Sequence, residues 1–298
     1  MAANDFVVLI PTAGRPNKVL TYKSLRKHGY TGKIFLVVAD DDISLGDYRT
    51  NYGKEVIVFN KAEIAKTFDS GDNFHDMRVV VYARNALWGI AKELGFKYFV
   101  ELDDDYTSFA YKFNTNLEYQ ERGILNLDKI FGAMFKYYKS INALSITMAQ
   151  NGDFMGGSKS SFAQELKLRR KAMNTFFCST DRPFQFIGRI NEDVNTYVTL
   201  GSKGQLFLTV PNISITQTTT QKQKGGMTEV YVDDGTYLKS FYSVMYAPSC
   251  VKVAPMGDKH KRLHHRVDWN AAVPLIINEA WRKRSILGAG KIEGKNAV

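Results

Sequence analysis

The sequence has little of what would mark several large classes of protein. Its only two cysteines, Cys178 and Cys250, stand far apart in 298 residues and match no spacing of metal ligands. We therefore expect neither a disulfide framework nor a zinc knuckle, and we do expect a reduced, cytoplasmic setting. The apolar run Phe6–Ile10 is only strand length, and no run approaches the roughly 18 residues of a membrane span. A soluble chain without signal peptide or anchor is predicted.

Two nucleotide-binding motifs are missing as well. No Gly-x-x-x-x-Gly-Lys-Ser/Thr pattern occurs, and no Gly-x-Gly-x-x-Gly follows an apolar run, which argues against an ATPase and a dinucleotide enzyme. There is no internal repeat and no linker rich in proline, glycine or serine. Because 44% of the residues are hydrophobic, we predict one domain over 1–298 with an ample core.

Positive charge is in excess. Lys and Arg number 40 and Asp and Glu number 30, a difference of +10. This surplus favours polyanionic partners such as nucleic acid, acidic lipid or phosphorylated small molecules. A basic surface kept for solubility explains the same number equally well. The cations come in pairs and triplets rather than in one tail, so a polyanion would lie on a folded face.

The first half alternates strand and helix patterns. The expected strands are Phe6–Ile10, Lys33–Ala39, Val56–Phe59 and Tyr98–Leu102. Helices are expected at Lys18–His28 and Val79–Leu94, the second ending at a Gly95 cap. This alternation predicts an α/β fold with a mostly parallel sheet, helices on both faces, and ligands at the carboxyl ends of the strands.

The second half is less regular. Its expected helices are Leu127–Ile141 and Glu192–Leu200, and its expected strands are Ala143–Met148, Ala172–Cys178 and Gln205–Val210. The segment Gln217–Met227 is polar and basic, which predicts a mobile loop over a site, and a tail is expected from Gly288.

Three acids follow directly on the strand Tyr98–Leu102. Asp103, Asp104 and Asp105 repel one another at the end of a buried strand unless a cation neutralises them, and carboxylate oxygens suit Mg²⁺ or Mn²⁺. Because strand side chains alternate, Asp103 and Asp105 face one side and are candidates for the metal and a diphosphate. Asp104 faces the other side and is a candidate contact for a sugar. The alternative is a solvated acidic turn.

Other candidate binding residues also lie at strand ends. Pro11, Thr12 and Arg15 follow the first strand at a helix start, where backbone N–H groups and a guanidinium favour an anion, although an ordinary turn is the alternative. Asp41 follows the second strand and can accept hydrogen bonds from a base or ribose, or else belongs to a capping loop. Arg84 lies in an apolar helix and needs a partner, for which a diphosphate or base is suitable.

These motifs together carry a resemblance. A strand ending in Ile-Pro-Thr-x-x-Arg, a strand ending in acids, a helix with Ala-Arg-Asn and a strand ending in Asp-Asp-Asp resemble the nucleotide-sugar half of the GT-A glycosyltransferase fold. The resemblance covers about residues 5–108 and leaves about 109–287 as an acceptor half, with 288–298 as the tail. It implies a uridine-diphosphate (UDP) sugar donor and a Mn²⁺ or Mg²⁺ ion.

Two later segments fit the same resemblance. The stretch 188–195 is similar to the Glu-Asp motif that faces the acceptor, and in inverting members one acid is the general base. This implies Asp193 as the base and Glu192 as the second choice, whereas the plain alternative is acids at a helix start. GT-A enzymes often supply a late metal ligand, which implies His265 or His264.

More specifically, the chain resembles the TET-associated glycosyltransferases of bacteriophages over residues 6–277. Its motifs are Ile-Pro-Thr-x-Gly-Arg, Leu-Asp-Asp-Asp-Tyr, Gly-Arg-x-x-Glu-Asp-Val-Asn and His-His-Arg-x-x-Trp-x-x-Ala-x-Pro. The resemblance implies transfer of glucose, arabinose or a similar sugar to 5-hydroxymethylcytosine in phage DNA, in the host cytoplasm. The candidate phosphate contacts are Arg169, Arg170, Lys171, Lys222 and Lys224.

Three rivals remain at this level. A glycosyltransferase of the same fold that acts on a glycan or protein would carry the basic charge incidentally. A non-catalytic nucleic-acid-binding protein would not need Asp103 or Asp105. A nucleotidyltransferase would use paired acids and a metal but release pyrophosphate instead of UDP.

Overall fold

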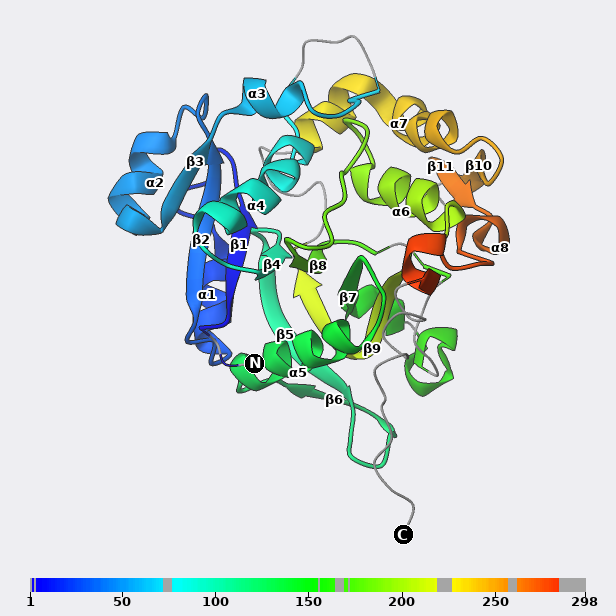
Figure 1. Ribbon diagram of the computed structural model, residues 1–298, viewed down its shortest axis with the longest axis horizontal. Helices are drawn as coiled ribbons and strands as arrows, with labels where there is room; N and C mark the ends of the chain where they lie inside the picture. Colours follow the sequence, from blue (N-terminus) through cyan, green and yellow to red (C-terminus); the bar gives the residue numbers. More distant parts are fainter. Residues whose placement is uncertain are drawn as a thin grey trace.

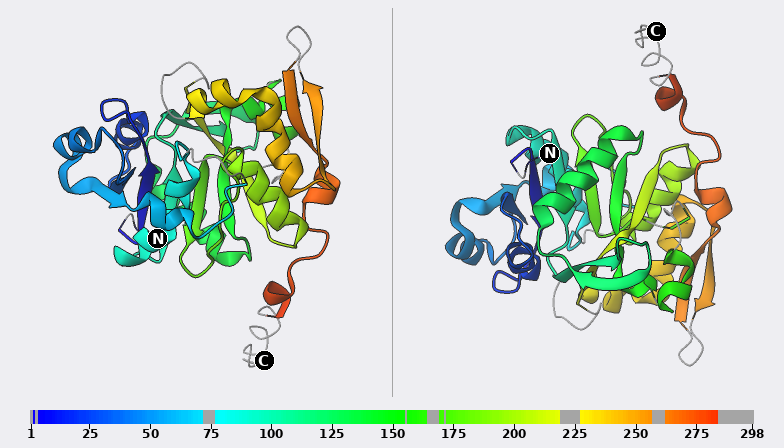
Figure 2. Two further views of the ribbon diagram at one scale, coloured as in Figure 1. Left: turned by 90° about the horizontal axis from the view of Figure 1, so that it is seen from above. Right: turned by 90° about the horizontal axis from the view of Figure 1, so that it is seen from below.

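The structure is a computed structural model that describes residues 2, 4–71, 77–154, 156–163, 169–170, 172–218, 227–256 and 262–283. At its centre is a nine-stranded sheet in the order β3-β2-β1-β4-β8-β7-β9-β5-β6. Its strands are β1 (Phe6–Pro11), β2 (Lys33–Ala39), β3 (Val56–Phe59), β4 (Tyr98–Leu102), β5 (Tyr106–Phe113), β6 (Tyr119–Gly123), β7 (Ser145–Gln150), β8 (Thr175–Ser179) and β9 (Phe207–Gln217). A second sheet pairs β10 (Val251–Met256) with β11 (Arg262–Val267), on the opposite side of the molecule from β1, β2 and β3 (Figures 1 and 2).

Helices cover both faces of the large sheet. They are α1 (Leu20–Lys27), α2 (Leu45–Tyr52), α3 (Lys61–Ala65), α4 (Val81–Glu93), α5 (Leu127–Ser140), α6 (Glu192–Ser202), α7 (Met227–Tyr246) and α8 (Trp269–Ala272), with short 3₁₀ turns at Gly53–Glu55, Asn151–Phe154, Gly157–Lys159 and Ser161–Ala163. Phe6 and Val8 pack in one core cluster with residues of α1 and α5, whereas Val7 and Leu9 pack in the other with residues of α4 and α6. Because both faces of β1 are covered, every residue of the strand is apolar and buried.

The strand directions bring functional ends together. β1 pairs in parallel with β2 and with β4, and β2 pairs in parallel with β3, so all four strands end at the same edge. β8 and β5 run opposite to the other strands of the sheet. The mostly parallel α/β sheet with helices on both faces, as predicted from the sequence, is therefore confirmed.

The end of α4 confirms a detail of the sequence interpretation. Gly95 has a φ of +77°, its N–H donates to the carbonyl of Lys92, and the Phe96 N–H donates to the carbonyl of Ala91. This is the Schellman arrangement, which needs a left-handed residue directly after the helix. It turns the chain sharply into β4, so that β4 begins three residues later at Tyr98.

Several elements differ from expectation. β9 continues to Gln217, well past the expected end at Val210, because its second half pairs with β5. The hairpin β5–β6 was not expected, and β6 is an exposed edge strand whose polar residues give little hydrophobic signal. Of the predicted mobile loop, Gln217 ends β9 and Met227 begins α7, and 219–226 lie outside the described residues, as does the predicted tail. Within the described part of the chain, no helix is long and apolar enough to cross a membrane.

Candidate active site

The turn between β4 and β5 holds the three adjacent acids, and α1 fixes its shape. Thr21 Oγ1 donates to the Asp103 carbonyl at 2.5 Å and accepts from the Tyr106 N–H at 2.8 Å. The Thr21 N–H donates to the Asp104 carbonyl at 3.1 Å. Since Thr21 is fully buried, these bonds are shielded from water and set the directions of the acids. A polar residue on the buried face of an expected helix is the signal in the sequence that could have identified Thr21.

Asp104 points toward the end of β1. It accepts from Thr12 Oγ1 at 2.7 Å and pairs with the Arg15 guanidinium at 3.0 Å. Tyr48 on α2 completes the group, with its hydroxyl 2.8 Å from Thr12 Oγ1 and accepting from the Arg15 N–H. Burial raises the pKa of Asp104, although Arg15 and Thr12 counteract it. Asp104 does face away from Asp103, as expected, but both of its oxygens bind protein groups, so it shapes the β1–α1 segment.

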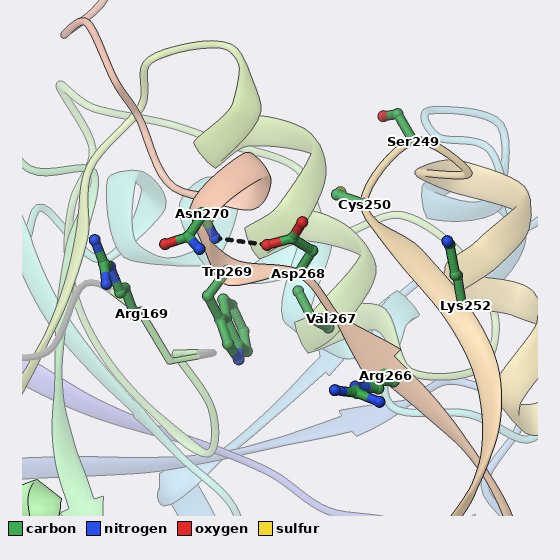
Figure 3. Close-up of a pocket in the computed structure, with 9 residues that line it drawn as sticks. All are labelled: Arg169, Ser249, Cys250, Lys252, Arg266, Val267, Asp268, Trp269 and Asn270. Atoms are coloured by element: carbon green, nitrogen blue, oxygen red, sulfur yellow. Dashed lines mark hydrogen bonds between the residues drawn. The ribbon is translucent and has the colours of Figure 1, made fainter.

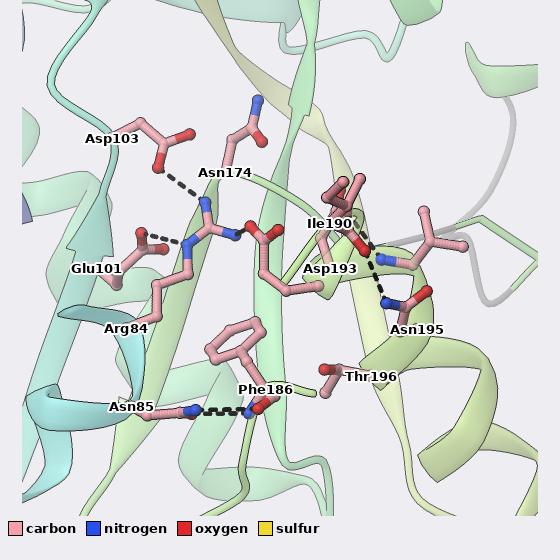
Figure 4. A network of polar contacts seen from close by, with 12 residues as sticks. Arg84, Asn85, Glu101, Asp103, Asn174, Phe186, Ile190, Asp193, Asn195 and Thr196 are labelled. Carbon is pink, nitrogen blue, oxygen red and sulfur yellow. Dashed lines mark hydrogen bonds and ion pairs between the residues drawn. The ribbon is translucent and has the colours of Figure 1, made fainter. Parts of the chain in front are cut away.

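Asp103 is joined to a buried arginine. Arg84 on α4 is 3% exposed, and its Nη2 lies 2.8 Å from Asp103 Oδ1 (Figure 4). Its Nη1 lies 2.6 Å from Glu192 Oε1, and its Nε lies 3.2 Å from Glu101 Oε1. The sequence led us to expect a diphosphate or base as the partner of Arg84. The structure instead surrounds the guanidinium with three carboxylates, which lie on β4, in the turn after it, and at the start of α6.

One guanidinium cannot neutralise three carboxylates. Burial raises the pKa of Glu101 well above its usual range, against the lowering effect of Arg84. Burial likewise raises the pKa of Glu192 to about 7, again opposed by Arg84. For Arg84 itself, burial lowers the pKa, but the charges of the three carboxylates outweigh it and raise the pKa. The network therefore keeps its arginine charged and favours the protonated forms of Glu101 and Glu192.

The pair Glu192-Asp193 begins α6. Asn191 precedes the helix in the left-handed region, with a φ of +56°. The Glu192 side chain is 8% exposed and turned toward Arg84, whereas Asp193 is half-buried and accepts from the Val194 N–H at 2.8 Å. The helix N-terminus stabilises negative charge on both acids. Asp193 is thus the more exposed acid of the pair.

Asp105 is the acid least balanced by positive charge. Its Oδ2 accepts from Thr218 Oγ1 at 3.0 Å, at the end of β9. Burial, together with the charges of Asp103 and Asp104, raises the pKa of Asp105 to about 7. A divalent cation would remove this repulsion, and Mg²⁺ is commonly held by one or two carboxylates plus phosphate and water oxygens. Asp103 and Asp105 fit such a donor set.

The two histidines lie elsewhere. His264 and His265 are in β11, which the sequence treated as a basic stretch, and His265 Nδ1 lies 3.2 Å from Asn191 Nδ2. Within the described residues, no group of three or more histidine, cysteine, aspartate or glutamate side chains is placed to hold a metal ion. The expected set of two aspartates and a late histidine is therefore not assembled, because strand pairing with β10 and packing against α7 place His265 beside Asn191.

The remaining donor-side residues surround the ends of β1 and β2. Pro11 is the last residue of β1, and the Thr12 N–H donates to the Val37 carbonyl at 3.2 Å. Asp41 is exposed and pairs with Lys61 at 2.7 Å, so it lies at the expected strand end with a protein partner. Its neighbour Asp42 accepts a hydrogen bond from the Gly14 N–H at 2.9 Å and so links the ends of β1 and β2.

The residues predicted to contact DNA phosphates differ in their surroundings. Arg170 is 15% exposed and paired with Asp153, with its Nε 3.0 Å from Asp153 Oδ1 and its guanidinium over the Phe162 ring. It therefore has a structural partner that the sequence did not indicate. Arg169 is exposed and lines a pocket beside β10 and β11 (Figure 3). Lys171, Lys222 and Lys224 lie outside the described residues.

Comparison with solved structures gives distant matches. TarS of S. aureus is 13% identical over 73% of this chain, with a TM-score of 0.43, and the match spans 37% of TarS. The mannosyltransferase PcManGT from Pyrobaculum calidifontis, solved with GDP-Man and Mn²⁺, is 13% identical over 72% of this chain and 56% of its own, with a TM-score of 0.41. Glucosyl-3-phosphoglycerate synthase from Mycobacterium tuberculosis, solved with Mn²⁺, UDP and phosphoglyceric acid, is 9% identical over 94% of this chain and 91% of its own, with a TM-score of 0.42. No curated protein sequence matches the chain.

The family comparison is more direct. The model of the TET-associated glycosyltransferases matches residues 6–226, which is most of the chain and includes the acids after β4, Arg84 and the Glu192-Asp193 pair. The match and the α/β sheet together confirm the GT-A fold class and the resemblance seen in the sequence. The chain belongs to the TET-associated glycosyltransferase family.

Proposed function

We propose that this chain transfers a sugar from a UDP-sugar to the hydroxyl of 5-hydroxymethylcytosine in DNA, with Mn²⁺ or Mg²⁺. Membership of the TET-associated family supports the reaction class, and the +10 charge supports a DNA acceptor. Residues of about 5–108 bind the donor and residues of about 109–287 bind the acceptor. The protein acts in the cytoplasm, that of the host if a phage encodes it.

The Arg84 network is the observation that carries the proposal. It joins Asp103, which directly follows β4, to Glu192, the neighbour of Asp193. Transfer with inversion places the leaving group and the acceptor hydroxyl on opposite sides of one anomeric carbon, so that each needs its own set of side chains close by. The single buried guanidinium holds both sets in one arrangement.

On the donor side, Asp103 and Asp105 would hold a divalent ion that the diphosphate also contacts, and Pro11, Thr12, Arg15 and Asp41 would surround the nucleotide. When bound, the ion neutralises charge on the departing diphosphate. The Arg15 side chain is 21% exposed and pairs with Asp104, so its position is fixed before a ligand arrives. A fixed cation costs less to order than a free one when it meets a phosphate.

On the acceptor side, Asp193 takes the proton of the hydroxymethyl group. The acceptor oxygen forms a bond to the anomeric carbon, the bond from that carbon to the UDP oxygen breaks, and the proton passes to the Asp193 carboxylate. Glu192 and Arg84 act through Asp193 as positioning residues. A 5-hydroxymethyl group projects into the major groove, so it meets Asp193 either there or after the base leaves the stack.

A mass measurement tests the proposal. The protein is incubated with Mn²⁺, a panel of UDP-sugars and DNA that contains 5-hydroxymethylcytosine, and the digested nucleosides are weighed. We expect one donor to raise the mass of 5-hydroxymethyl-2′-deoxycytidine by that of its sugar less one water, and none to change the nucleosides of DNA with plain cytosine. Labelling of a glycan or protein acceptor with no change in the nucleosides would overturn the DNA assignment.

A further inference from the structure

A pocket of about 590 Å³ lies away from the acids, between β10, β11, α8 and the segment around Arg169 (Figure 3). Its lining brings together cationic, polar and aromatic side chains from three separate parts of the chain. The residues are Arg169, Ser249, Cys250, Lys252, Arg266, Val267, Asp268, Trp269 and Asn270.

The cations of this pocket have no acidic partner in an ion pair among the described residues. Lys252 and Arg266 lie directly opposite each other in the β10–β11 pair, and like charges in that position repel. Arg169 adds a third positive charge from a distant segment. In the described part of the chain none of these three exposed side chains makes an ion pair. Three cations left unpaired around one cavity are what an anionic ligand would neutralise.

The one acid in the lining already has a role. Asp268 is the N-cap of α8, where its Oδ1 accepts from the Asn270 N–H at 3.0 Å. Its carboxylate therefore points into the helix start, and the lining keeps a surplus of two positive charges, three cations less one acid.

The pocket is rigidly connected to α6. The Trp269 ring contacts the Tyr197 ring with centroids 5.6 Å apart. Val194 of α6 shares a core cluster with Cys250 and Val251 at the start of β10. Tyr197 follows Asp193 by four residues, a rise of roughly 6 Å along the helix. A ligand in the pocket therefore has a fixed position relative to the proposed general base.

We propose that this pocket binds phosphodiester groups of the DNA acceptor strand, and that it places the strand relative to Asp193. The inference rests on the proposed function, and it names Lys252, Arg266 and Arg169 as backbone contacts. Phosphodiesters carry one charge each at regular spacing, which matches three separate cations that outnumber the one acid of the lining. The half-buried Trp269 gives the pocket an apolar wall against which a sugar or base can rest.

The test uses a double variant, Lys252→Gln with Arg266→Gln, in the full chain. Its matched control is Lys129→Gln with Lys136→Gln, two exposed cations of α5 on the other face of the sheet, so that both variants lose two charges. Binding of a fluorescein-labelled duplex containing 5-hydroxymethylcytosine is measured by polarisation at several salt concentrations, and UDP binding is measured by calorimetry.

We expect the pocket variant to bind the duplex roughly tenfold more weakly and its salt slope to fall by about 2, with UDP affinity unchanged. The control should stay close to the wild type. Equal DNA affinity in the two variants would overturn the proposal, and so would a loss of UDP affinity, which would assign the pocket to the donor diphosphate. If the wild type binds the duplex through this pocket but adds no sugar to it, the proposed function fails and the binding site remains.

Discussion

The buried network around Arg84 and the exposed pocket beside Trp269 each bring together several charges of one sign, but among the described residues only the network pairs those charges with an opposite one. In the network, three carboxylates share one arginine that is 3% exposed, and burial raises the pKa of Glu101 and of Glu192. In the pocket, Lys252 and Arg266 face each other in water without a carboxylate partner among the described residues. Charge satisfied inside the protein fixes geometry, whereas charge left on the surface is available to a ligand.

The largest effect is expected when Asp193, the acid next to the network, is replaced. Asp193→Asn should lower the transfer rate by about 10² to 10⁴, because the acceptor proton loses its base. UDP affinity and the melting temperature should hardly change, since Asp193 is half-buried and it is the neighbouring Glu192 whose carboxylate pairs with Arg84. Initial rates at saturating donor measure the effect. A larger loss in Glu192→Gln than in Asp193→Asn would move the base role to Glu192.

Removing the shared arginine tests whether the network is structural. Arg84→Met leaves Glu101, Asp103 and Glu192 without their counter-charge, which should cost about 3–5 kcal/mol in the free energy of unfolding. Arg84→Lys keeps the charge but not the three separate contacts, and it should cost less. Urea unfolding followed by circular dichroism gives both values. If Arg84→Met and the wild type are equally stable, the network does not stabilise the fold.

Asp105 connects pH with metal binding. Its folded pKa of about 7 lies above the usual 3.8, so in the absence of metal the folded chain holds a proton that the unfolded chain releases, and stability falls as pH rises between these values. Asp105→Asn should remove that fall and stabilise the metal-free chain above pH 7 by on the order of 2 kcal/mol. Thermal unfolding over a range of pH measures this difference.

The same variant has a metal readout. Above pH 7, Mn²⁺ should raise the melting temperature of the wild type by relieving the repulsion between Asp103 and Asp105, and it should have little effect on Asp105→Asn. EDTA should abolish sugar transfer by the wild type. If neither Mn²⁺ nor EDTA changes the melting temperature or the activity of the wild type, Asp103 and Asp105 are not metal ligands.

The smallest expected effects distinguish two adjacent arginines. Arg170→Gln breaks the pair with Asp153 and should cost about 1 kcal/mol of stability while leaving DNA affinity unchanged. Arg169→Gln should leave stability unchanged and weaken DNA binding a few fold, because its guanidinium lines the pocket. Melting temperature and polarisation together separate the two roles. Reversed results would mean that Arg170 meets the DNA.

Sequence reasoning succeeded where neighbours in the chain decide the outcome. β1, β2 and β4 are short apolar runs bounded by polar residues, and Gly95 follows its helix directly, so local pattern was enough. β6 and β11 were missed because edge and hairpin strands carry polar side chains and owe their form to pairing.

The candidate site was predictable as a set of residue types but not as a set of contacts. Adjacent acids after β4 and at the start of α6 attract attention in the sequence. Nothing local shows that Arg84 reaches Glu192, 108 residues later, or that Asp104 turns to Thr12 and Arg15. For the same reason His265 looked like a metal ligand, although the fold places it beside Asn191.

The position of Arg84 also matters for anyone who builds hybrid enzymes. Suppose that the region after residue 109 is replaced by that of another sugar transferase. The start of the new helix would then lie opposite the Arg84 guanidinium, which stays on α4. Because Glu192 meets Arg84 at 2.6 Å, the two positions need to be inherited together, along with Asp103 and Glu101. Substitutions in the surface pocket are therefore an easier way to change acceptor preference, because they leave the contacts between Arg84 and its carboxylates intact.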